Sequence, residues 1–242
     1  MSKPDLLAEI ARFNSQTAGR DKLFRLLQYS SRFIWYVIQK NSNRRDLVTK
    51  FQNLEVTFSS GRRLLRLGRF LDGLHSAMAT IGLPNVPLRL CLTLTRLAYA
   101  LYMLIDNMVW LHQVGLITID KDGWHHTANK LWLVSAMAAL ARDLYEVSEL
   151  LTLYLGQGGP STLRSVSGSK QISTLSDLGA QFMTVHRGLV IDLVKNFADF
   201  WLPYTALGYT GLRPGTIGLL GIISSLAGIM PMFQPSLKLV PS

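Results

Sequence analysis

The histidine side chains are the groups in this sequence best suited to catalysis or metal binding, and their spacing supports neither. There are five, namely His75, His112, His125, His126 and His186. None belongs to a His-Glu-x-x-His pair, and the adjacent His125 and His126 would point to different faces of a helix. We therefore predict no catalytic residue and no metal site.

A glycine run near the C-terminus could suggest a phosphate-binding loop, but its context argues against one. Gly215, Gly218 and Gly221 lack the Lys-Ser/Thr pair of a phosphate loop and the order of a dinucleotide-binding motif. They also lie within an apolar stretch. The sequence therefore predicts no bound cofactor and a protein that is not an enzyme.

One acidic residue lies inside an apolar segment, where a charge requires an explanation. Asp106, followed by Asn107, comes directly after the uncharged run of residues 97–105. An ionisable group in a membrane helix can serve a transport path or can pair with a group on a neighbouring helix. We favour pairing with an arginine of another helix.

A ridge of arginines opposite a ridge of leucines marks residues 62–74. At about 100° per residue, Arg62, Arg66 and Arg69 share one narrow stripe, and Arg63 adds a fourth positive charge. The opposite side carries Leu64, Leu67, Leu71 and Leu74. This pattern is typical of a helix that lies among lipid headgroups, with its arginines on anionic lipid. The alternative is a helix that packs its leucines against the core of the protein.

The residues just before this ridge carry a second apolar face. Leu47, Phe51, Leu54, Phe58 and Leu65 fall in a stripe about 60° wide, and the first four join the predicted membrane-binding residues. One straight helix over residues 47–80 would present two apolar faces that point nearly apart. We therefore predict a bend near Ser59, Ser60 and Gly61.

The whole chain is apolar and basic at once, which favours a membrane partner over nucleic acid. Its 242 residues are 48% hydrophobic and only 17% charged, with a formal net charge of +10, whereas soluble domains carry about 25% charged residues. Residues 1–80 hold 14 Lys and Arg against 6 Asp and Glu, and residues 81–242 hold 11 against 9. This basic first third fits anionic headgroups, nucleic acid or acidic protein surfaces. Because the arginine ridge lacks interleaved aromatics and any known motif, we predict no nucleic-acid binding.

Cysteine usage and terminal segments indicate a membrane reached from the cytosol. The single cysteine, Cys91, excludes an internal disulfide framework and favours a reducing compartment. Residues 1–13 carry charges and no uninterrupted apolar core, so we expect no secretory signal. The last residues do not form a Ser-Lys-Leu import address. We expect insertion from the cytosolic side.

Apolar periodicity predicts an all-α fold, a membrane-associated bundle of amphipathic and transmembrane helices. We expect a helix from Asp21, as its N-cap, to Ile38, and further helices over 47–80, 88–114, 131–155 and 177–200. The chain divides into a helical region (1–155) with a candidate membrane helix at 88–114, a flexible Gly/Ser linker (156–173) and a C-terminal region (174–242). The last region ends in the best transmembrane candidate, about residues 214–233, which is uncharged and about 30 Å long as a helix. The number of spanning helices stays open.

Small residues recur every four positions in and before this last helix. Gly211 and Gly215, Gly221 and Ser225, and Ser224 and Gly228 are each four apart, a spacing that allows close helix pairing in lipid. We predict that these positions pack helices together and allow the protein to form homo-oligomers. The alternative is that glycine is simply common in membrane helices.

Five longer stretches resemble the peroxin-eleven family of peroxisomal membrane proteins, and most closely its animal alpha and beta branch. They are FNSQTAGRDKLFRLLQY at 13–29, SSGRRLLRLGRFLDGLHSA at 59–77, LYMLIDNMVWLHQVGL at 101–116, ARDLYEV at 141–147 and PGTIGLLGIISSLAGI at 214–229. They occur in the family's order and cover most of the chain except the linker, whose length does not resemble the glycine-rich insert of some members.

The resemblance implies an integral peroxisomal membrane protein that elongates peroxisomes and promotes their division. In the family an amphipathic helix, which maps within residues 47–80, remodels the bilayer. The resemblance also implies self-association and the assembly of division factors, including a dynamin-related GTPase and its membrane adaptors. The expected partners are thus membrane lipids with anionic headgroups, further copies of the chain and these factors.

A different class of function remains open at this stage. Arg89, Arg96 and Asp106 could line a pore, which would make the protein a membrane channel or carrier for small metabolites.

Overall fold

The computed structural model describes residues 6–40, 44–157 and 183–239, and every regular element in these ranges is a helix. The elements are α1 (Leu6–Ser15), α2 (Thr17–Ile38), α3 (Arg45–Leu65), α4 (Phe70–Thr80), α5 (Val86–Gln113), α6 (Lys121–Gln157), α9 (Arg187–Ala206), α10 (Pro214–Phe233) and the 3-10 turn η2 (Pro235–Leu237). The predicted all-α class is confirmed.

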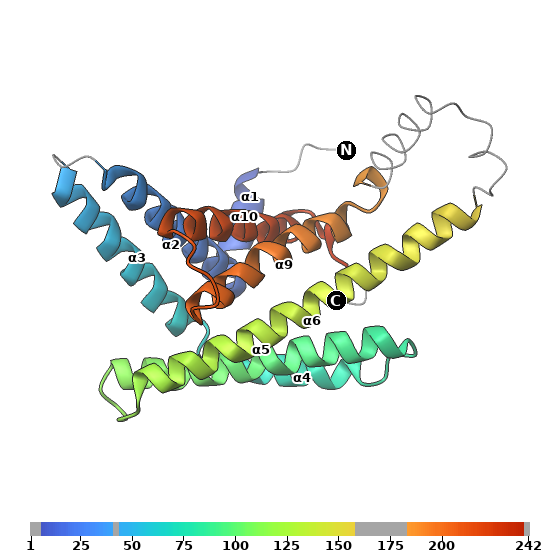
Figure 1. Ribbon diagram of the computed structural model, residues 1–242, viewed down its shortest axis with the longest axis horizontal. Coiled ribbons are helices and arrows are strands. Elements are labelled where there is room, and N and C mark those ends of the chain that lie inside the picture. The colour runs from blue at the N-terminus through green and yellow to red at the C-terminus, as the bar shows by residue number, and fades with distance from the viewer. Residues whose placement is uncertain (1–5, 41–43, 158–182, 240–242) are drawn as a thin grey trace.

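Most helices pack against two others and together enclose a common interior. Contacts run in the order α3, α2, α10, α9, α6, α5 and α4, and α3 also contacts α5. Figure 1 shows α2, α3 and α10 grouped on one side, α4, α5 and α6 in a second layer below, and α9 between α10 and α6. The segments before residue 40 and after residue 213 thus lie side by side in space.

Local signals fix where the two most apolar helices begin. Asn85 caps α5 by accepting a hydrogen bond from the Leu88 amide at 3.2 Å. Pro214 lies in the first turn of α10, where a missing amide costs nothing. The prediction for residues 214–233 agrees with α10, and the one for 88–114 agrees with α5 to within two residues.

Other predicted boundaries need correction. Asp21 does not cap a helix, because α2 begins at Thr17 and Asp21 is buried within it. The helix predicted from residue 131 begins earlier, at Lys121. The prediction missed its first turns because they are polar and carry no apolar stripe. Of the helix predicted over 177–200, residues 177–182 lie outside the described residues, residues 183–185 are helical, and α9 begins at Arg187 after a bend at His186. The predicted linker falls outside the described residues, except for positions 156 and 157 at the end of α6.

The bend predicted near Ser59, Ser60 and Gly61 is also misplaced. α3 continues through these residues to Leu65, and Gly61 lies against the Phe24 ring of α2, so its missing side chain allows close approach. The break comes at residues 66–69, which we call the elbow. There Gly68 has a φ of 78°, a left-handed conformation that glycine adopts without steric cost.

The interior of the bundle mixes polar and apolar side chains, and its surface carries two apolar stripes. Asp143, Ser224 and Ser225 are almost fully buried, and so are Ala100 and Val109. Exposed apolar side chains recur every three or four residues along α5 (Leu90, Leu94, Leu97, Leu101) and α10 (Leu219, Ile223, Leu226, Met230), so each series forms one side of its helix. Apolar stripes on the surface together with charged groups inside fit a lipid surrounding.

α5 and α10 are long and apolar enough to cross a membrane. Their most apolar windows have mean hydropathies of 1.4 and 1.8, and only 22% and 33% of those windows are buried in the fold. A core helix of a soluble protein passes the same length test but is mostly buried. The outward stripes therefore favour two spanning helices over two core helices.

Candidate functional site

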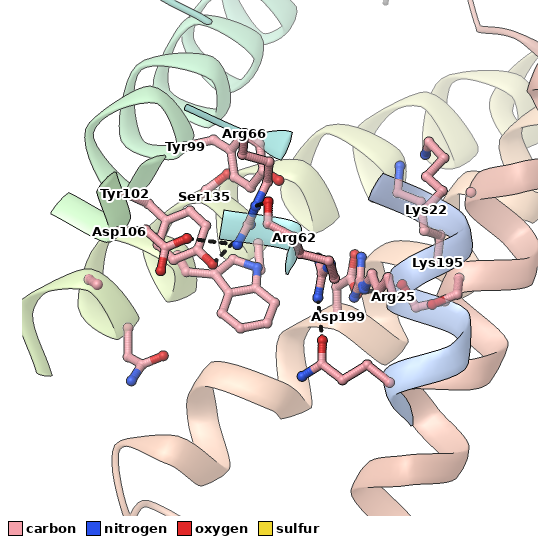
Figure 2. Close-up of a pocket in the computed structure, with 18 of the residues that line it drawn as sticks. Lys22, Arg25, Arg62, Arg66, Tyr99, Tyr102, Asp106, Ser135, Lys195 and Asp199 are labelled. Atoms are coloured by element: carbon pink, nitrogen blue, oxygen red, sulfur yellow. Dashed lines mark hydrogen bonds and ion pairs between the residues drawn. The ribbon is translucent and has the colours of Figure 1, made fainter. Parts of the chain in front are cut away.

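The arginines predicted to form a basic ridge turn into the protein. Arg66, 5% exposed, places Nη2 2.7 Å from Oδ2 of Asp106, and Arg63 places Nε 3.1 Å from the other oxygen of that carboxylate. Arg62 donates from Nε to Asp21 Oδ1 at 3.1 Å. The predicted pairing of Asp106 with an arginine of a neighbouring helix is confirmed. Figure 2 shows the Arg66 guanidinium directed at Asp106.

These ion pairs hold three segments of the chain together. Asp21 lies on α2, Arg62 on α3 and Asp106 on α5, so the elbow is tied to both neighbouring helices. Burial alone would raise the pKa of Asp21, but the guanidinium groups of Arg62 and Arg66 outweigh burial and lower that pKa below its ordinary value. Asp21 therefore stays charged, and a charged partner is what a buried guanidinium requires.

Arg66 contacts Tyr102 in addition to the carboxylates of Asp106 and Asp21. Its Nη1 donates to the hydroxyl of Tyr102 at 3.3 Å, and its guanidinium lies 5.8 Å from the centre of that ring. Such a planar group can use hydrogen bonds and a ring face together, which a lysine could not do.

A second cluster joins α6 to α9. Arg142 pairs with Asp143 at 2.8 Å and with Asp192, which also binds Lys195. Asn196 donates to Asp143 at 2.7 Å. Burial raises the pKa of Asp143 to about 6, despite the nearby Arg142. Arg142 and Asp143 are 5% and 0% exposed, so this side of α6 points inward.

A third pair joins α2 to α9 and α10. Arg25 pairs with Asp199, and Ser224 of α10 donates a hydrogen bond to the same carboxylate. Sequence reasoning missed this cluster. Polar residues isolated in otherwise apolar helices did indicate buried polar contacts. Periodicity cannot match Arg25 with Asp199, because the two lie 174 residues apart in sequence.

The helices enclose a basic cavity of about 390 Å³. Its charged lining comprises Lys22, Arg25, Arg62, Arg63, Arg66 and Lys195 against the carboxylates Asp106 and Asp199. Figure 2 labels all of these side chains except Arg63 and shows that they come from several helices. A second cavity, of about 490 Å³, shares Lys22 and Lys195 with it. Among the described residues, no group of His, Cys, Asp or Glu is arranged to hold a metal ion.

The predicted membrane-binding residues separate into an inner and an outer set. Arg62 and Arg66 are committed to the internal ion pairs, Arg69 lies 3.7 Å from Asp21, and Phe51, Phe58 and Leu74 are half-buried. The outer set consists of Leu47, Leu54, Leu64, Leu67 and Leu71. Contact of these residues with lipid stays a prediction.

The predicted helix-packing residues lie mainly against α2 of the same chain. A side chain added at Gly215 would overlap the Tyr36 ring, and one at Gly221 would overlap the Tyr29 ring. Ser225 is buried with them, whereas Gly211 has open space around it. A Cβ atom added at Gly228 would lie 2.9 Å from Lys22 Nζ. Small residues thus allow close contact inside one chain, and pairing between copies through them stays a prediction.

Comparison with known proteins gives a consistent result. Residues 7–233 match the family model described as Peroxisomal biogenesis factor 11 (PEX11). The chain is 33% identical to Peroxisomal membrane protein 11A of Homo sapiens, over 94% of this chain and 97% of that protein. It is 31% identical to Peroxisomal membrane protein 11B of Pongo abelii, over 95% and 98% of the two chains. A Dictyostelium discoideum protein named Peroxisomal membrane protein 11 homolog is 24% identical over 96% and 98%. No solved structure matches.

Proposed function

Because this chain belongs to the Peroxisomal biogenesis factor 11 family and is an integral protein of the peroxisomal membrane, we propose that it elongates peroxisomes and promotes their division. The proposed mechanism is insertion of the α3–α4 region into one leaflet. Self-association and the assembly of fission factors, including a dynamin-related GTPase and its membrane adaptors, complete the proposal. The predicted resemblance to this family is confirmed.

One observation carries this proposal: the elbow and the helix ends beside it expose leucines, while Arg66 of the elbow is buried. Leu64, Leu67 and Leu71, which we call the elbow leucines, are 54%, 48% and 60% exposed. Arg66, between them in sequence, is tied to Asp106. A group of exposed leucines beside membrane-spanning helices is typical of a surface that contacts lipid. They are positioned to enter the headgroup region.

The energy available from this contact is moderate. Full burial of a leucine is worth about 1.5–3 kcal/mol, and side chains already half-covered gain roughly half of that. The three elbow leucines together supply on the order of 3 kcal/mol. Exposed basic residues near the start of α3, namely Arg44, Arg45 and Lys50, add about 1 kcal/mol each on an anionic surface. In this proposal they replace Arg62 and Arg66 as headgroup contacts.

Insertion on one side bends the bilayer because only one leaflet expands. A helix that enters about 5–10 Å widens the headgroup region and leaves the opposite leaflet unchanged. α5 and α10 keep the helix at the membrane, so insertion needs no separate binding step. Self-association would raise the local density of inserted helices. Since the glycines of α10 already contact α2, such contacts would use another face.

The alternative of a channel or carrier receives less support from the described contacts. Asp106 is neutralised by Arg63 and Arg66, and Arg96 donates from Nη1 to the Ser76 carbonyl at 2.7 Å. The Asp106 charge is therefore not available to line a path, and Arg96 is held at one nitrogen by a backbone carbonyl. Remodelling therefore remains the function that we propose.

Reconstitution of the full chain into vesicles with anionic lipid tests the proposal. We expect wild-type protein to draw tubules from the vesicles and the double variant Leu67→Asp/Leu71→Asp to leave them spherical. Because both leucines are exposed, the variant should keep the wild-type melting temperature in detergent.

A matched control separates loss of apolar contact from added negative charge. Gln52 and Asn53 are exposed on α3, and Gln52→Asp/Asn53→Asp adds the same charge without removing a leucine. We expect this control to retain most tubulation. Equal tubulation by the leucine variant and wild type would reject the assignment of the elbow to the bilayer.

A further inference from the structure

Two adjacent cavities share a pair of lysines. Lys22 of α2 and Lys195 of α9 line both cavities. They also converge on Gly228 of α10, where an added Cβ would lie 2.9 Å from Lys22 Nζ and 3.8 Å from Lys195 Cδ. Figure 2 shows the two lysines approaching each other. Lys195 binds Asp192. Lys22 binds no carboxylate within the described part of the chain.

The carboxylates near Lys22 are all paired with other cations. Arg25 and Lys195 lie close to Lys22 and pair with Asp199 and Asp192, and the neighbouring Asp21 pairs with Arg62. Burial, Lys195 and Arg25 together lower the pKa of Lys22 to about 8. The fold therefore keeps a cation where a cation is unfavourable, which is characteristic of a binding site rather than of packing.

The second cavity adds further unbalanced cations. Arg96 of α5 and Lys238, which follows η2, both line it. In residues 6–40, 44–157 and 183–239, no carboxylate lies within ion-pair distance of either side chain. The region also holds an unused donor, because Nε of Arg25 is buried without a hydrogen-bond acceptor. Lys238 is exposed to solvent and Arg96 is half-buried, whereas Lys22 is the more deeply buried cation. An anion with several acceptor oxygens would balance these cations and accept a hydrogen bond from Nε of Arg25.

We propose that the wall shared by the two cavities, around Lys22 and Lys195, binds a phosphate-bearing anion. A phosphate group carries about 1.5 to 2 negative charges at neutral pH and three acceptor oxygens, whereas a carboxylate supplies one charge and two oxygens. Volumes of about 390 and 490 Å³ are sufficient for a small ligand. A lysine is a suitable phosphate ligand because its ammonium acts as a point charge.

The phosphate could belong to a free solute or to a lipid headgroup. The second cavity offers apolar side chains beside its cations, namely Leu92, Pro231, Met232, Leu237 and Leu239. These would contact an acyl chain, while the first cavity is lined mainly by polar groups. Both sources would place the same phosphate at Lys22.

Thermal unfolding of the full-length protein in neutral detergent tests the free-solute source. We expect inorganic phosphate to raise the melting temperature by roughly 5 °C at saturation, beyond the effect of acetate or chloride at equal ionic strength. Nanodiscs of phosphatidylcholine, with and without phosphatidic acid, test the headgroup source through retained lipid counted by native mass spectrometry. A response to phosphate identifies a solute, and retention of phosphatidic acid alone identifies a headgroup.

Variants at Lys22 distinguish a specific site from general attraction. Lys22→Gln should weaken phosphate or phosphatidic acid binding at least ten-fold. It should not lower the melting temperature of the ligand-free protein, since no partner is lost. Lys22→Arg should restore binding. Lys130 is exposed on α6, and the charge-matched control Lys130→Gln should bind like wild type.

Two results would overturn the proposal. One is the absence of any response to phosphate and to phosphatidic acid. The other is an equal response in wild type and Lys22→Gln. The readouts are binding and melting, so this proposal can fail while the vesicle-tubulation proposal stands, and the reverse is equally possible.

Discussion

Removal of the Asp106 charge should destabilise the protein more than any surface substitution. The carboxylate lies 2.7 Å from Arg66 and 3.1 Å from Arg63, and Asp106 and Arg66 are 6% and 5% exposed. Asp106→Asn keeps the shape of the side chain but leaves a buried guanidinium without its counter-charge beside α5. Breaking one side of such a pair costs about 3–5 kcal/mol.

Arg66 retains only partial compensation in this variant. Asp21 Oδ1 is 3.8 Å from Arg66 Nε and is already bonded to Arg62. The expected loss corresponds to a fall in melting temperature of about 10 °C for a chain of this length. The measurement is thermal unfolding of purified protein in detergent or nanodiscs, followed by circular dichroism.

A double-mutant cycle makes the test specific. Arg66→Gln combined with Asp106→Asn replaces both charges with amides, so the double variant should be more stable than the sum of the single losses predicts, by about 1–3 kcal/mol. Asp72→Asn provides the control, because Asp72 is exposed on α4 and should change stability by less than about 0.5 kcal/mol. Additive losses, or an Asp106→Asn variant as stable as wild type, would refute the buried-pair argument.

Three further outcomes follow from the packing and the charges. Gly221→Leu should destabilise the protein by about 1–3 kcal/mol, since its side chain enters space filled by a tyrosine ring, while Gly211→Leu should have little effect; chemical denaturation in detergent compares them. Leu97→Lys should reduce carbonate-resistant membrane integration, since a lysine at a helix centre costs about 2.5–3.5 kcal/mol in lipid. Burial raises the pKa of Asp143 from 3.8 to about 6, so the native state binds the proton more tightly and wild-type stability should fall by about 2 kcal/mol as pH rises from 4 to 6. Asp143→Asn should remove that pH dependence of the melting temperature, and an unchanged slope would contradict it.

The sequence predicted those elements whose limits depend on local chemistry. The uncharged run that follows Arg213 predicted the bounds of α10, and apolar periodicity predicted α5 to within two residues. Asp106 also stood out, because a carboxylate inside an apolar helix needs a cation. These inferences require only neighbours along the chain.

Periodicity could not reveal which side of an amphipathic helix faces inward. Arg62 and Arg66 were assigned to headgroups because arginine usually faces solvent, yet Asp21 and Asp106 provide charged partners inside the fold. Those partners lie about 40 residues away from the arginines and cannot be aligned with them from one sequence. Lys22, which binds no carboxylate within residues 6–40, 44–157 and 183–239, was missed for the same reason, since a missing partner is visible only when the surroundings are known.

The leucine stripes that face outward on α5 and α10 have a consequence for the newly made chain. Before the chain reaches a bilayer, these stripes face water, and folding of the bundle leaves them exposed. A chain that is completed in water would therefore be prone to aggregate through these stripes. We expect the amount of protein that reaches the membrane to depend on how quickly a chaperone or a lipid bilayer covers the apolar stripes of α5 and α10.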